Sequence, residues 1–223
     1  METVLTKSLA LLGVHERLYK NASTGYNVLK RTLDVFLALV ALVLLSPVFF
    51  IVALCVKLDS KGPAFFRQQR CCEKGKLFTM HKFRTMKIDA EQIRQQLEIY
   101  NEMDGPVFKI LDDPRITRVG RILRKTSLDE LPQLFNILKG DMTIVGPRPP
   151  LPREVEQYSP YQMQRLLVKP GLTCYWQVMG RNNLDFNTWI ELDLKYIREM
   201  GLKTDLKIMF KTIPAVIKQE GAY

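Results

Sequence analysis

One uncharged, apolar stretch of 22 residues, at positions 35–56, limits what this chain can fold into. Its length is sufficient to cross the hydrocarbon core of a bilayer. It is not a secretory signal peptide, because it begins more than 30 residues into the sequence and is followed by Lys57-Leu58-Asp59, not by a small-residue cleavage site. The stretch therefore predicts a membrane-associated segment that stays in the mature protein.

Two features bear on whether this segment crosses the membrane. Ser46-Pro47 lies in its middle, and a proline there removes an amide donor and destabilises a regular helix by about 3 kcal/mol. Basic residues, which mark the cytoplasmic side, flank both ends: Lys20, Lys30, Arg31, Lys57, Lys61, Arg67 and Arg70. The residues alone leave two alternatives open, a re-entrant helical hairpin broken at Ser46-Pro47 and a kinked transmembrane helix.

The composition is that of a globular domain. The chain has 223 residues, 47% of them hydrophobic and 25% charged, which excludes a disordered chain. A mean hydropathy of −0.07 excludes a carrier with several membrane spans. The four cysteines match no zinc or disulfide pattern and the two histidines are too few for a histidine-based metal site. We therefore expect reduced, structural thiols in a protein that faces the cytosol.

The remaining sequence predicts an α+β fold that is mostly helical. Residues 64–70 and 76–82 are predicted to form a β-hairpin that turns through Glu73-Lys74-Gly75. Helices are predicted over residues 88–103, 131–138, 154–168, 188–200 and 205–219. The last is amphipathic with a lysine-rich polar face, which is typical of a helix in the membrane interface and also of a terminal helix packed on a core.

Arginines recur at intervals of three in residues 114–125, at Arg115, Arg118, Arg121 and Arg124. On a helix this spacing produces a slowly drifting basic stripe, suited to phosphate groups or anionic lipids. A solvated charged face is the alternative. Lys82 and Arg84 follow the hairpin, and prolines flank Arg148 in Pro147-Arg148-Pro149. Because these prolines hold the chain extended, Arg148 loses little entropy when it binds a phosphate.

Two adjacent acids, Asp129 and Glu130, follow the arginines directly. Pro132 is tolerated in the first turn of a helix, so a helix is predicted to begin near the acids and to place both carboxylates at its positive end. Carboxylates among arginines can bind a divalent metal, and one can attack phosphorus as a nucleophile. The alternative is helix capping, because Asp is a preferred N-cap and Ser127 with Glu130 has capping-box spacing.

Together these motifs resemble those of the bacterial sugar transferases, the monotopic polyprenyl-phosphate phosphoglycosyl transferases, from about Lys30 to the C-terminus. The motifs that carry the resemblance are Lys30-Arg31, Ser46-Pro47, Lys82-Phe83-Arg84-Thr85-Met86, Asp113-Pro114-Arg115-Ile116-Thr117, Ser127-Leu128-Asp129-Glu130-Leu131-Pro132-Gln133, residues 136–141, Gly146-Pro147-Arg148-Pro149, Lys169-Pro170-Gly171-Leu172-Thr173 and Gln177-Val178-Met179-Gly180-Arg181-Asn182. Larger family members carry an N-terminal multi-span region, so the resemblance is to the small, single-domain type.

The resemblance implies transfer of a sugar 1-phosphate from a UDP-sugar to undecaprenyl phosphate, with release of UMP, as the first membrane step of surface polysaccharide or glycoconjugate assembly. It implies Asp129 as the nucleophile that carries the phosphosugar, and Mg²⁺ held by Asp129 and Glu130. Phosphate and nucleotide contacts fall on Lys82, Arg84, Arg124, Pro147, Arg148, Pro149 and Arg181, and supporting acids on Asp193 and Asp205.

The resemblance also favours the re-entrant hairpin over the crossing helix. It implies an N-terminal extension at residues 1–29, a membrane hairpin at 30–58 and a catalytic domain at 59–223 with interfacial helices around the active site. We expect a monotopic protein on the cytosolic face of the bacterial inner membrane, with a homodimer as a possible assembly.

Two other function classes compete with an enzyme. The net charge of +10 is compatible with nucleic-acid binding. However, the acidic pair would repel phosphates, and nucleic-acid binding does not call for a 22-residue apolar stretch, so no nucleic-acid partner is expected. A membrane-tethered scaffold, in which the acids only cap a helix, is the other class. The activity of an Asp129 variant separates that scaffold from an enzyme.

Overall fold

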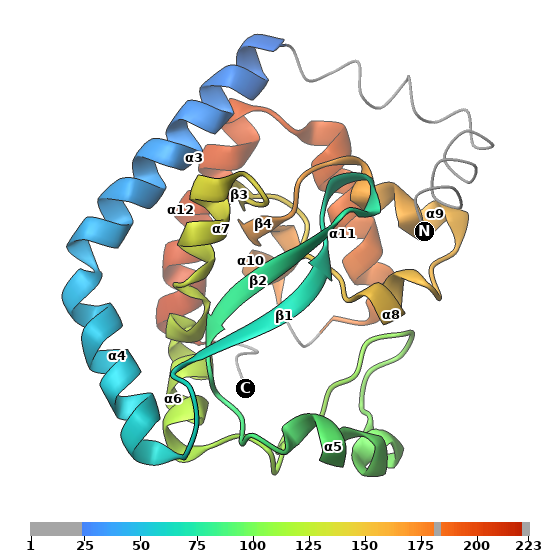
Figure 1. The fold of residues 1–223 in the computed structure, drawn as a ribbon. Helices are drawn as coiled ribbons and strands as arrows, with labels where there is room; N and C mark the ends of the chain where they lie inside the picture. The colour runs from blue at the N-terminus through green and yellow to red at the C-terminus, as the bar shows by residue number, and fades with distance from the viewer. Residues whose placement is uncertain (1–23, 181–183, 220–223) are drawn as a thin grey trace.

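The computed structural model describes residues 24–180 and 184–219 (Figure 1). These residues are mostly helical and include two small two-stranded sheets, one of them a hairpin, which confirms the mostly helical α+β prediction. The first helix, α3 (Thr24–Leu44), begins before the predicted start of the membrane hairpin at residue 30. Most of the predicted N-terminal extension, and the predicted site residue Arg181, lie outside the described residues.

The apolar stretch forms two helices broken where the sequence predicted. α3 ends at Leu44 and α4 (Ser46–Asp59) begins directly after it, with Pro47 in its first turn. The Ser46 hydroxyl donates to the carbonyl of Val43 at 2.9 Å, so it satisfies a carbonyl at the break. Within the described residues no single helix is long and apolar enough to span a bilayer, whereas α3 and α4 together are, with a bend of 63° between them.

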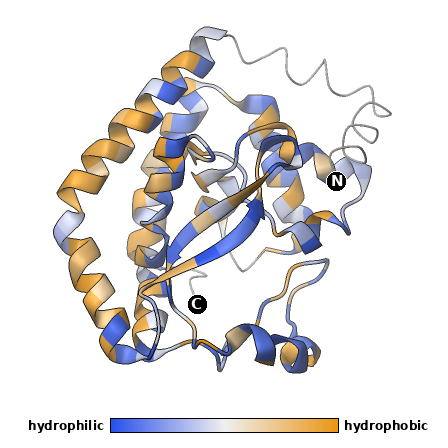
Figure 2. Ribbon diagram, viewed as in Figure 1, coloured by the Kyte–Doolittle hydropathy of each residue, from blue (hydrophilic) through white to orange (hydrophobic). Residues whose placement is uncertain are grey.

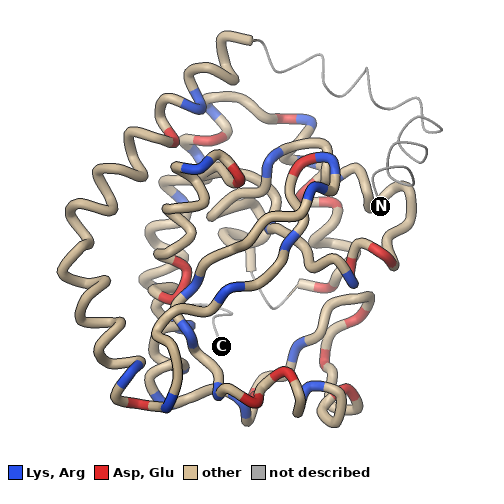
Figure 3. The backbone as a smooth tube through the Cα atoms, viewed as in Figure 1, with Lys and Arg blue, Asp and Glu red and all other residues tan. Residues whose placement is uncertain are grey.

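The helix pair forms an arc along one side of the molecule, and its outer surface is apolar (Figures 1 and 2). Charged residues lie toward the two ends of the arc and not along its middle (Figure 3). The exposed large apolar side chains of this arc include Phe36, Leu39, Val43, Leu44, Phe50, Ile51 and Leu54. A continuous exposed apolar surface of this kind marks an interaction surface for apolar partners or lipid.

Both ends of the arc are bound to the same globular body. The Arg31 guanidinium donates to the carbonyls of Ile137 and Leu138, at 2.6 and 2.7 Å, near the end of α7 (Gln133–Lys139). At the other end, Arg84 donates to the carbonyls of Val56 and Ser60, at 3.4 and 2.9 Å, where α4 ends. These cations add hydrogen bonds to carbonyls at the helix ends, where the helix itself supplies few donors. The start of α3 and the end of α4 are therefore held close to one folded unit.

The hairpin is made of β1 (Phe65–Cys71) and β2 (Leu77–Phe83), which pair antiparallel through the turn η1 (Glu73–Gly75). Each strand begins and ends one residue later than predicted. Phe66 pairs with Lys82, and Gln68 pairs with Met80. Because side chains alternate between the two faces of a strand, Arg70 shares a face with Gln68, Phe66 and Lys82.

Three predicted helices are close to those observed: α7, α11 (Phe186–Glu199) and α12 (Leu202–Lys218). The prediction of one helix over residues 88–103 is wrong, because α5 (Ala90–Arg94) passes into the 3₁₀ turn η2 (Gln95–Tyr100). Ile99 is 82% exposed and Tyr100 is 59% exposed, so the second half of the predicted helix has little core to pack on.

The predicted helix over residues 154–168 is also wrong. That segment contains α8 (Pro152–Val155), α9 (Pro160–Met163) and the 3₁₀ turn η4 (Gln164–Leu167). Pro160 starts a new helix with Ser159 as its N-cap, and this interrupts the chain. On α12 the side chains of Leu206, Phe210 and Ile213 are exposed, so the other described residues do not cover the apolar face that was predicted for the membrane interface.

A second sheet, which the sequence did not predict, pairs β3 (Thr143–Val145) with β4 (Gly171–Thr173) in parallel. Gly146 follows β3 and lies against the segment before β4. A Cβ atom on Gly146 would lie 2.5 Å from the carbonyl oxygen of Lys169, so no side chain fits there. The packing joins two of the motifs noted in the sequence, Gly146-Pro147-Arg148-Pro149 and Lys169-Pro170-Gly171. After β4 the chain continues into α10 (Tyr175–Met179).

Candidate active site

The acidic pair lies in a short 3₁₀ turn between two helices. α6 (Arg118–Thr126) ends at Ser127, which adopts the left-handed conformation (φ 58°), and η3 (Leu128–Glu130) follows it. Neither η3 nor α7 begins with a side-chain capping hydrogen bond, and the residue before α7 is Pro132. The predicted capping box of Ser127 and Glu130 is therefore not formed. Helix capping does not account for the two acids.

Lys82 of β2 lies against both acids. Its Nζ is 2.7 Å from Oε1 of Glu130 and 3.8 Å from Oδ2 of Asp129. Asp129 is 7% exposed, and this burial raises the pKa of its carboxyl to about 6, with Lys82 opposing the shift and Glu130 adding to it. Asp129 is therefore mostly ionised at neutral pH but more basic than an ordinary aspartate, which suits a nucleophile.

The raised pKa predicts that Asp129→Asn stabilises the fold. The folded-state value of about 6 exceeds the unfolded value of about 3.9, so folding favours the protonated form and the ionised carboxylate opposes folding. We expect the substitution to raise the unfolding free energy by about 1–3 kcal/mol at pH 7.5, and by about 1 kcal/mol less at pH 5. Thermal unfolding in one detergent at both pH values measures this. Equal melting temperatures of the two proteins at pH 7.5 would contradict it.

Asp129 and Glu130 border a cavity of about 500 Å³. The face of the hairpin that carries Lys82 forms one wall, and the end of α6, residues 148–149 and residues 84–115 contribute others. Basic side chains in its lining outnumber acidic ones two to one. The excess of positive charge suits a polyanionic ligand such as a diphosphate.

Two members of the predicted basic stripe, Arg115 and Arg124, line this cavity, and Arg124 is the one on α6. Its Nε donates to the hydroxyl of Thr85 at 3.0 Å. A Cβ on Gly120 would lie 2.1 Å from the carbonyl oxygen of Thr85, so glycine is needed for α6 to pack there. The stripe is not one face: Arg118 and Arg121 are exposed, and Arg115 precedes α6 and forms a buried ion pair with Asp113.

The loop after β3 carries Arg148 and Pro149 to the cavity. The Arg148 guanidinium lies 5.4 Å from the ring centre of Trp189, and the Arg148 carbonyl accepts a hydrogen bond from Arg165 at 3.2 Å. Pro147 does not line the cavity, and its carbonyl accepts from the amide of Gly171 at 2.9 Å. The loop is thus fixed on both sides of Arg148.

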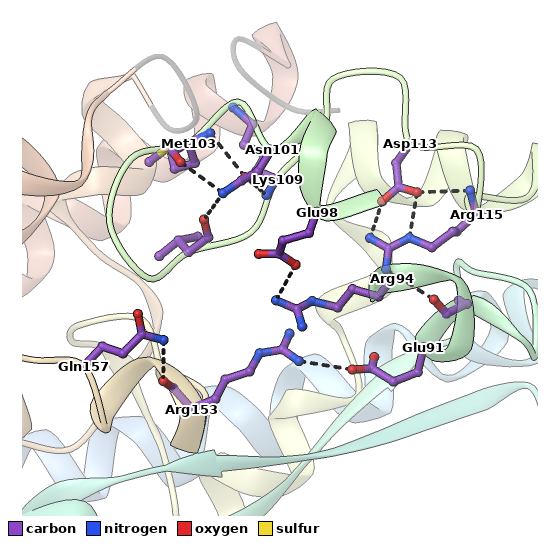
Figure 4. A network of polar contacts seen from close by, with 12 residues as sticks. Glu91, Arg94, Glu98, Asn101, Met103, Lys109, Asp113, Arg115, Arg153 and Gln157 are labelled. Atoms are coloured by element: carbon purple, nitrogen blue, oxygen red, sulfur yellow. Dashed lines mark hydrogen bonds and ion pairs between the residues drawn. The ribbon is translucent and has the colours of Figure 1, made fainter. Parts of the chain in front are cut away.

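Residues 90–115 form the wall opposite the hairpin (Figure 4). The Asn101 amide closes a loop in this wall, because its Nδ2 donates to the carbonyl of Val107 at 3.2 Å and its Oδ1 accepts from the amide of Lys109 at 2.8 Å. Arg153 and Glu91 form an ion pair of 3.1 Å that joins the wall to α8. The segment that was predicted only as a helix over residues 88–103 is therefore part of the site.

The structure gives the contacts of three further predicted residues. Arg84 borders the cavity, but its guanidinium is occupied by carbonyls at the end of α4. Asp193 lies behind Trp189 and forms a buried ion pair of 2.6 Å with Arg165. Asp205 does not line the cavity and accepts hydrogen bonds from Tyr26, Lys30 and Tyr196, at 2.8, 2.7 and 2.9 Å. It connects α3 to the catalytic domain.

The sequence analysis missed Arg70, Trp176 and Trp189, which also line the cavity. The two tryptophan rings stack with centres 4.7 Å apart. For Arg70 the signal was strand alternation, since it lies two residues from Gln68 on the face that carries Lys82. No comparable local signal exists for the tryptophans, whose proximity depends on how α10 and α11 pack.

The donor set at the acidic pair is compatible with a hard divalent cation. Mg²⁺ is commonly held by one or two carboxylates together with substrate phosphates and water. Asp129 and Glu130 supply two adjacent carboxylates, and among the described residues no cluster of three or more acidic, histidine or cysteine side chains could hold a metal alone. These residues fit a metal that binds jointly with a phosphate ligand.

Comparison with known proteins gives consistent matches. Residues 25–219 match the family described as bacterial sugar transferase. Galactosyl transferase CpsE of Streptococcus agalactiae is 45% identical over 194 residues, which are 86% of this chain and 43% of that protein. Exopolysaccharide production protein ExoY of Sinorhizobium fredii is 43% identical over 198 residues, 87% of this chain and 88% of that protein.

A third relative, UDP-glucose:undecaprenyl-phosphate glucose-1-phosphate transferase of Escherichia coli, is 42% identical over 216 residues, 92% of this chain and 44% of that protein. The chain thus spans about half the length of the Streptococcus and Escherichia relatives and most of the length of ExoY. Since the family match covers nearly all of the sequence and agrees with these relatives, the chain belongs to the bacterial sugar transferase family.

Proposed function

We propose that this protein transfers a sugar 1-phosphate from a UDP-sugar to undecaprenyl phosphate and releases UMP. The observation that carries the proposal is Asp129, a buried carboxylate with a raised pKa that has no capping role and lies in a cavity rich in cations. The names of the relatives support the donor and the acceptor. The product would be the first lipid-linked intermediate of a surface polysaccharide or glycoconjugate.

The reaction consists of two displacements at one phosphorus atom. A carboxylate oxygen of Asp129 attacks the sugar-linked phosphorus, and the bond between that phosphorus and the bridging oxygen breaks, so UMP leaves with the bridging oxygen. A phosphate oxygen of undecaprenyl phosphate then attacks the phosphosugar and releases the Asp129 carboxylate. Lys82 lies within 4 Å of both acids and stabilises charge at the attacked phosphate.

Asp129 and Glu130 would hold Mg²⁺, which offsets the charge of the diphosphate so that an anionic carboxylate can approach it. The function is tested with purified protein, undecaprenyl phosphate and a panel of UDP-sugars, by detecting released UMP and the lipid product. The same assay with excess chelator tests the metal, and full activity there would refute the metal requirement. No UMP release with any UDP-sugar would refute the function.

We further propose that α3 and α4 form a re-entrant membrane hairpin on the cytosolic face. The support is that Arg31 and Arg84 bind opposite ends of the helix pair to one folded body, whereas a crossing helix would place its ends on opposite sides of the membrane. The exposed apolar face of α12 then suits the membrane interface.

The topology predicts that both ends of the helix pair are shielded from outside the cell. Single cysteines at the exposed positions Asn27 and Lys61, in a variant without the four native cysteines, should react with an impermeant thiol reagent only after the cells are broken. Pro47→Ala in the same background should favour a crossing helix and expose one end. Labelling of either site in intact cells with Pro47 present would contradict the hairpin.

A further inference from the structure

Arg70 is a buried charge without a counter-ion. Its side chain is 6% exposed, and among the described residues no carboxylate oxygen lies within the 4.0 Å of an ion pair. Its hydrogen bonds go to neutral acceptors. Nε and Nη2 donate to Oε1 of Gln68, at 3.1 and 2.7 Å, and Nη1 donates to the carbonyl of Pro149 at 3.0 Å.

Two other buried guanidinium groups near this site, those of Arg115 and Arg165, are neutralised by carboxylates. Arg115 lies 2.6 Å from a carboxylate oxygen of Asp113, and Arg165 lies 2.6 Å from one of Asp193. Arg84 is also buried without a carboxylate, but its guanidinium is taken up by five hydrogen bonds to carbonyl and hydroxyl oxygens.

Burying a charge without such a partner is unfavourable. The pKa of Arg70 falls to about 9 because of burial and because of the nearby Arg148, and the charges of Glu154 and Glu130 oppose this shift only in part. The site therefore holds a cation that forms no direct ion pair with the described residues and whose charge Glu154 and Glu130 compensate only in part.

Arg70 also borders the cavity that contains the acidic pair. It lines the cavity on the same hairpin face as Lys82, and only three of its five N–H groups donate to the described residues. Gln68 and Pro149 hold the guanidinium in place, so little entropy is lost when it binds an anion. Its bond to Pro149 places it beside Arg148, which gives two adjacent guanidinium groups in one wall.

The two cationic groups of the cavity lie at different ends of the hairpin. Lys82 contacts the acidic pair and is paired with Phe66, four residues before Arg70 on β1. Four residues of a strand span about 13 Å. In an in-line displacement the leaving group departs on the side opposite the nucleophile. The Arg70 side chain is close enough to Glu130 for the two charges to interact, but it begins farther along the hairpin than Lys82, which contacts both acids. Lys82 therefore suits the attacked phosphate, and Arg70 suits the departing one.

We propose that Arg70 binds the phosphate of the leaving nucleoside monophosphate, together with Arg148. The inference rests on the proposed function and adds to it a binding residue for the leaving group. Charge complementarity supports this assignment, because a bound phosphate supplies the counter-charge that Arg70 lacks. Arg70 would serve the first displacement and the affinity for UMP. Because the lipid phosphate must attack from the side opposite Asp129, it takes the position that UMP leaves, and Arg70 would contact it in the second displacement as well.

The test compares Arg70→Met and Arg70→Lys with Arg67→Met. Arg67 lies on the same strand but is exposed on the opposite face, outside the cavity, so it controls for loss of one positive charge. In Arg70→Met we expect the inhibition constant of UMP and the KM of the donor to rise by about 10- to 100-fold. Arg70→Lys keeps the positive charge but loses the two parallel N–H donors of the guanidinium. Its inhibition constant for UMP and its KM for the donor should therefore lie between those of the wild type and those of Arg70→Met. The KM of undecaprenyl phosphate should rise as well, because the lipid phosphate attacks from the position that UMP leaves.

Four outcomes decide the inference. Unchanged UMP inhibition in an active Arg70→Met enzyme would refute it and leave the proposed function intact. An increase confined to the KM of the lipid acceptor, with unchanged UMP inhibition, would also refute it, because Arg70 would then contact the lipid and not the leaving nucleotide. If Arg70→Met does not fold, unchanged UMP inhibition in folded Arg70→Lys would refute the inference. Wild-type protein that forms no lipid-linked sugar would overturn the proposed function and this inference with it.

Discussion

Asp129→Asn is expected to abolish both turnover and the covalent intermediate, with a loss of activity of about 1,000-fold or more. The amide is not a nucleophile, whereas the wild-type carboxylate is ionised at neutral pH and lies beside Lys82. When the UDP-sugar is supplied without lipid acceptor, the wild-type protein should retain a phosphosugar on Asp129. Ping-pong kinetics follow from the same two-step reaction.

Intact-protein mass spectrometry after incubation with donor alone measures the adduct. An acyl phosphate hydrolyses, so the sample must be quenched quickly and kept cold. Glu130→Gln should still form the adduct but more slowly, because it weakens the metal site and not the nucleophile. Asp112→Asn is the matched control, since its side chain is 92% exposed and does not line the cavity. A wild-type enzyme with normal turnover and no adduct would favour direct attack by the lipid phosphate.

The pKa of Asp129 gives this experiment a pH dependence. Because the value is about 6 in the folded protein, the fraction of reactive carboxylate falls as the pH is lowered through 6. The rate of adduct formation with donor alone should then fall about tenfold for each further pH unit below that value. A rate that stays constant between pH 7 and pH 5 would show that Asp129 does not titrate there and would weaken its assignment as the nucleophile.

The membrane arm was predictable because its determinants are local. The length of the uncharged stretch determines the length of the helix pair. Pro47 disrupts the helical turn that precedes it, so the break at Ser46-Pro47 follows from a few neighbouring residues. The hairpin was predicted to within one residue at each end for a similar reason, since Lys74 and Gly75 form its turn. Whether the arm is re-entrant in a membrane stays a prediction.

The site was only partly predictable because its geometry is not local. The acids were expected at a helix N-terminus, but Ser127 in the left-handed conformation places them in a separate 3₁₀ turn. The pairing of β3 with β4 joins distant segments of three residues each, and such strands carry no periodicity. The role of Arg70 depends on a missing counter-ion, which no sequence pattern records.

Some predicted residues differ from expectation because the resemblance identifies positions and not contacts. Arg84 binds carbonyls at the end of α4, and Asp205 binds residues of α3 and α11. Both connect the apolar arm to the catalytic body. A residue can therefore matter for activity through the placement of the arm, without touching a phosphate.

The buried ion pair of Arg165 and Asp193 is expected to be the most sensitive point of the fold. Both side chains are about 1% exposed, and the two groups lie 2.6 Å apart. Asp193→Ala should destabilise the protein by about 3–5 kcal/mol, because it leaves the Arg165 cation buried without its partner. For a chain of this length each kcal/mol lowers the melting temperature by about 2–4 °C. Glu191→Ala, an exposed change on the same helix, should stay within about 0.5 kcal/mol.

A double-mutant cycle separates this pair from ordinary core disruption. Arg165→Met also loses hydrogen bonds to Tyr158 and to the Arg148 carbonyl, at 2.7 and 3.2 Å, so it should raise the KM of the donor as well as lower stability. Arg165→Met combined with Asp193→Leu removes both charges and should be clearly more stable than the sum of the single changes implies, because no unpaired charge stays buried. Additive losses would mean that the two residues contribute to the core independently, and that the ion pair does not hold Arg148 in place.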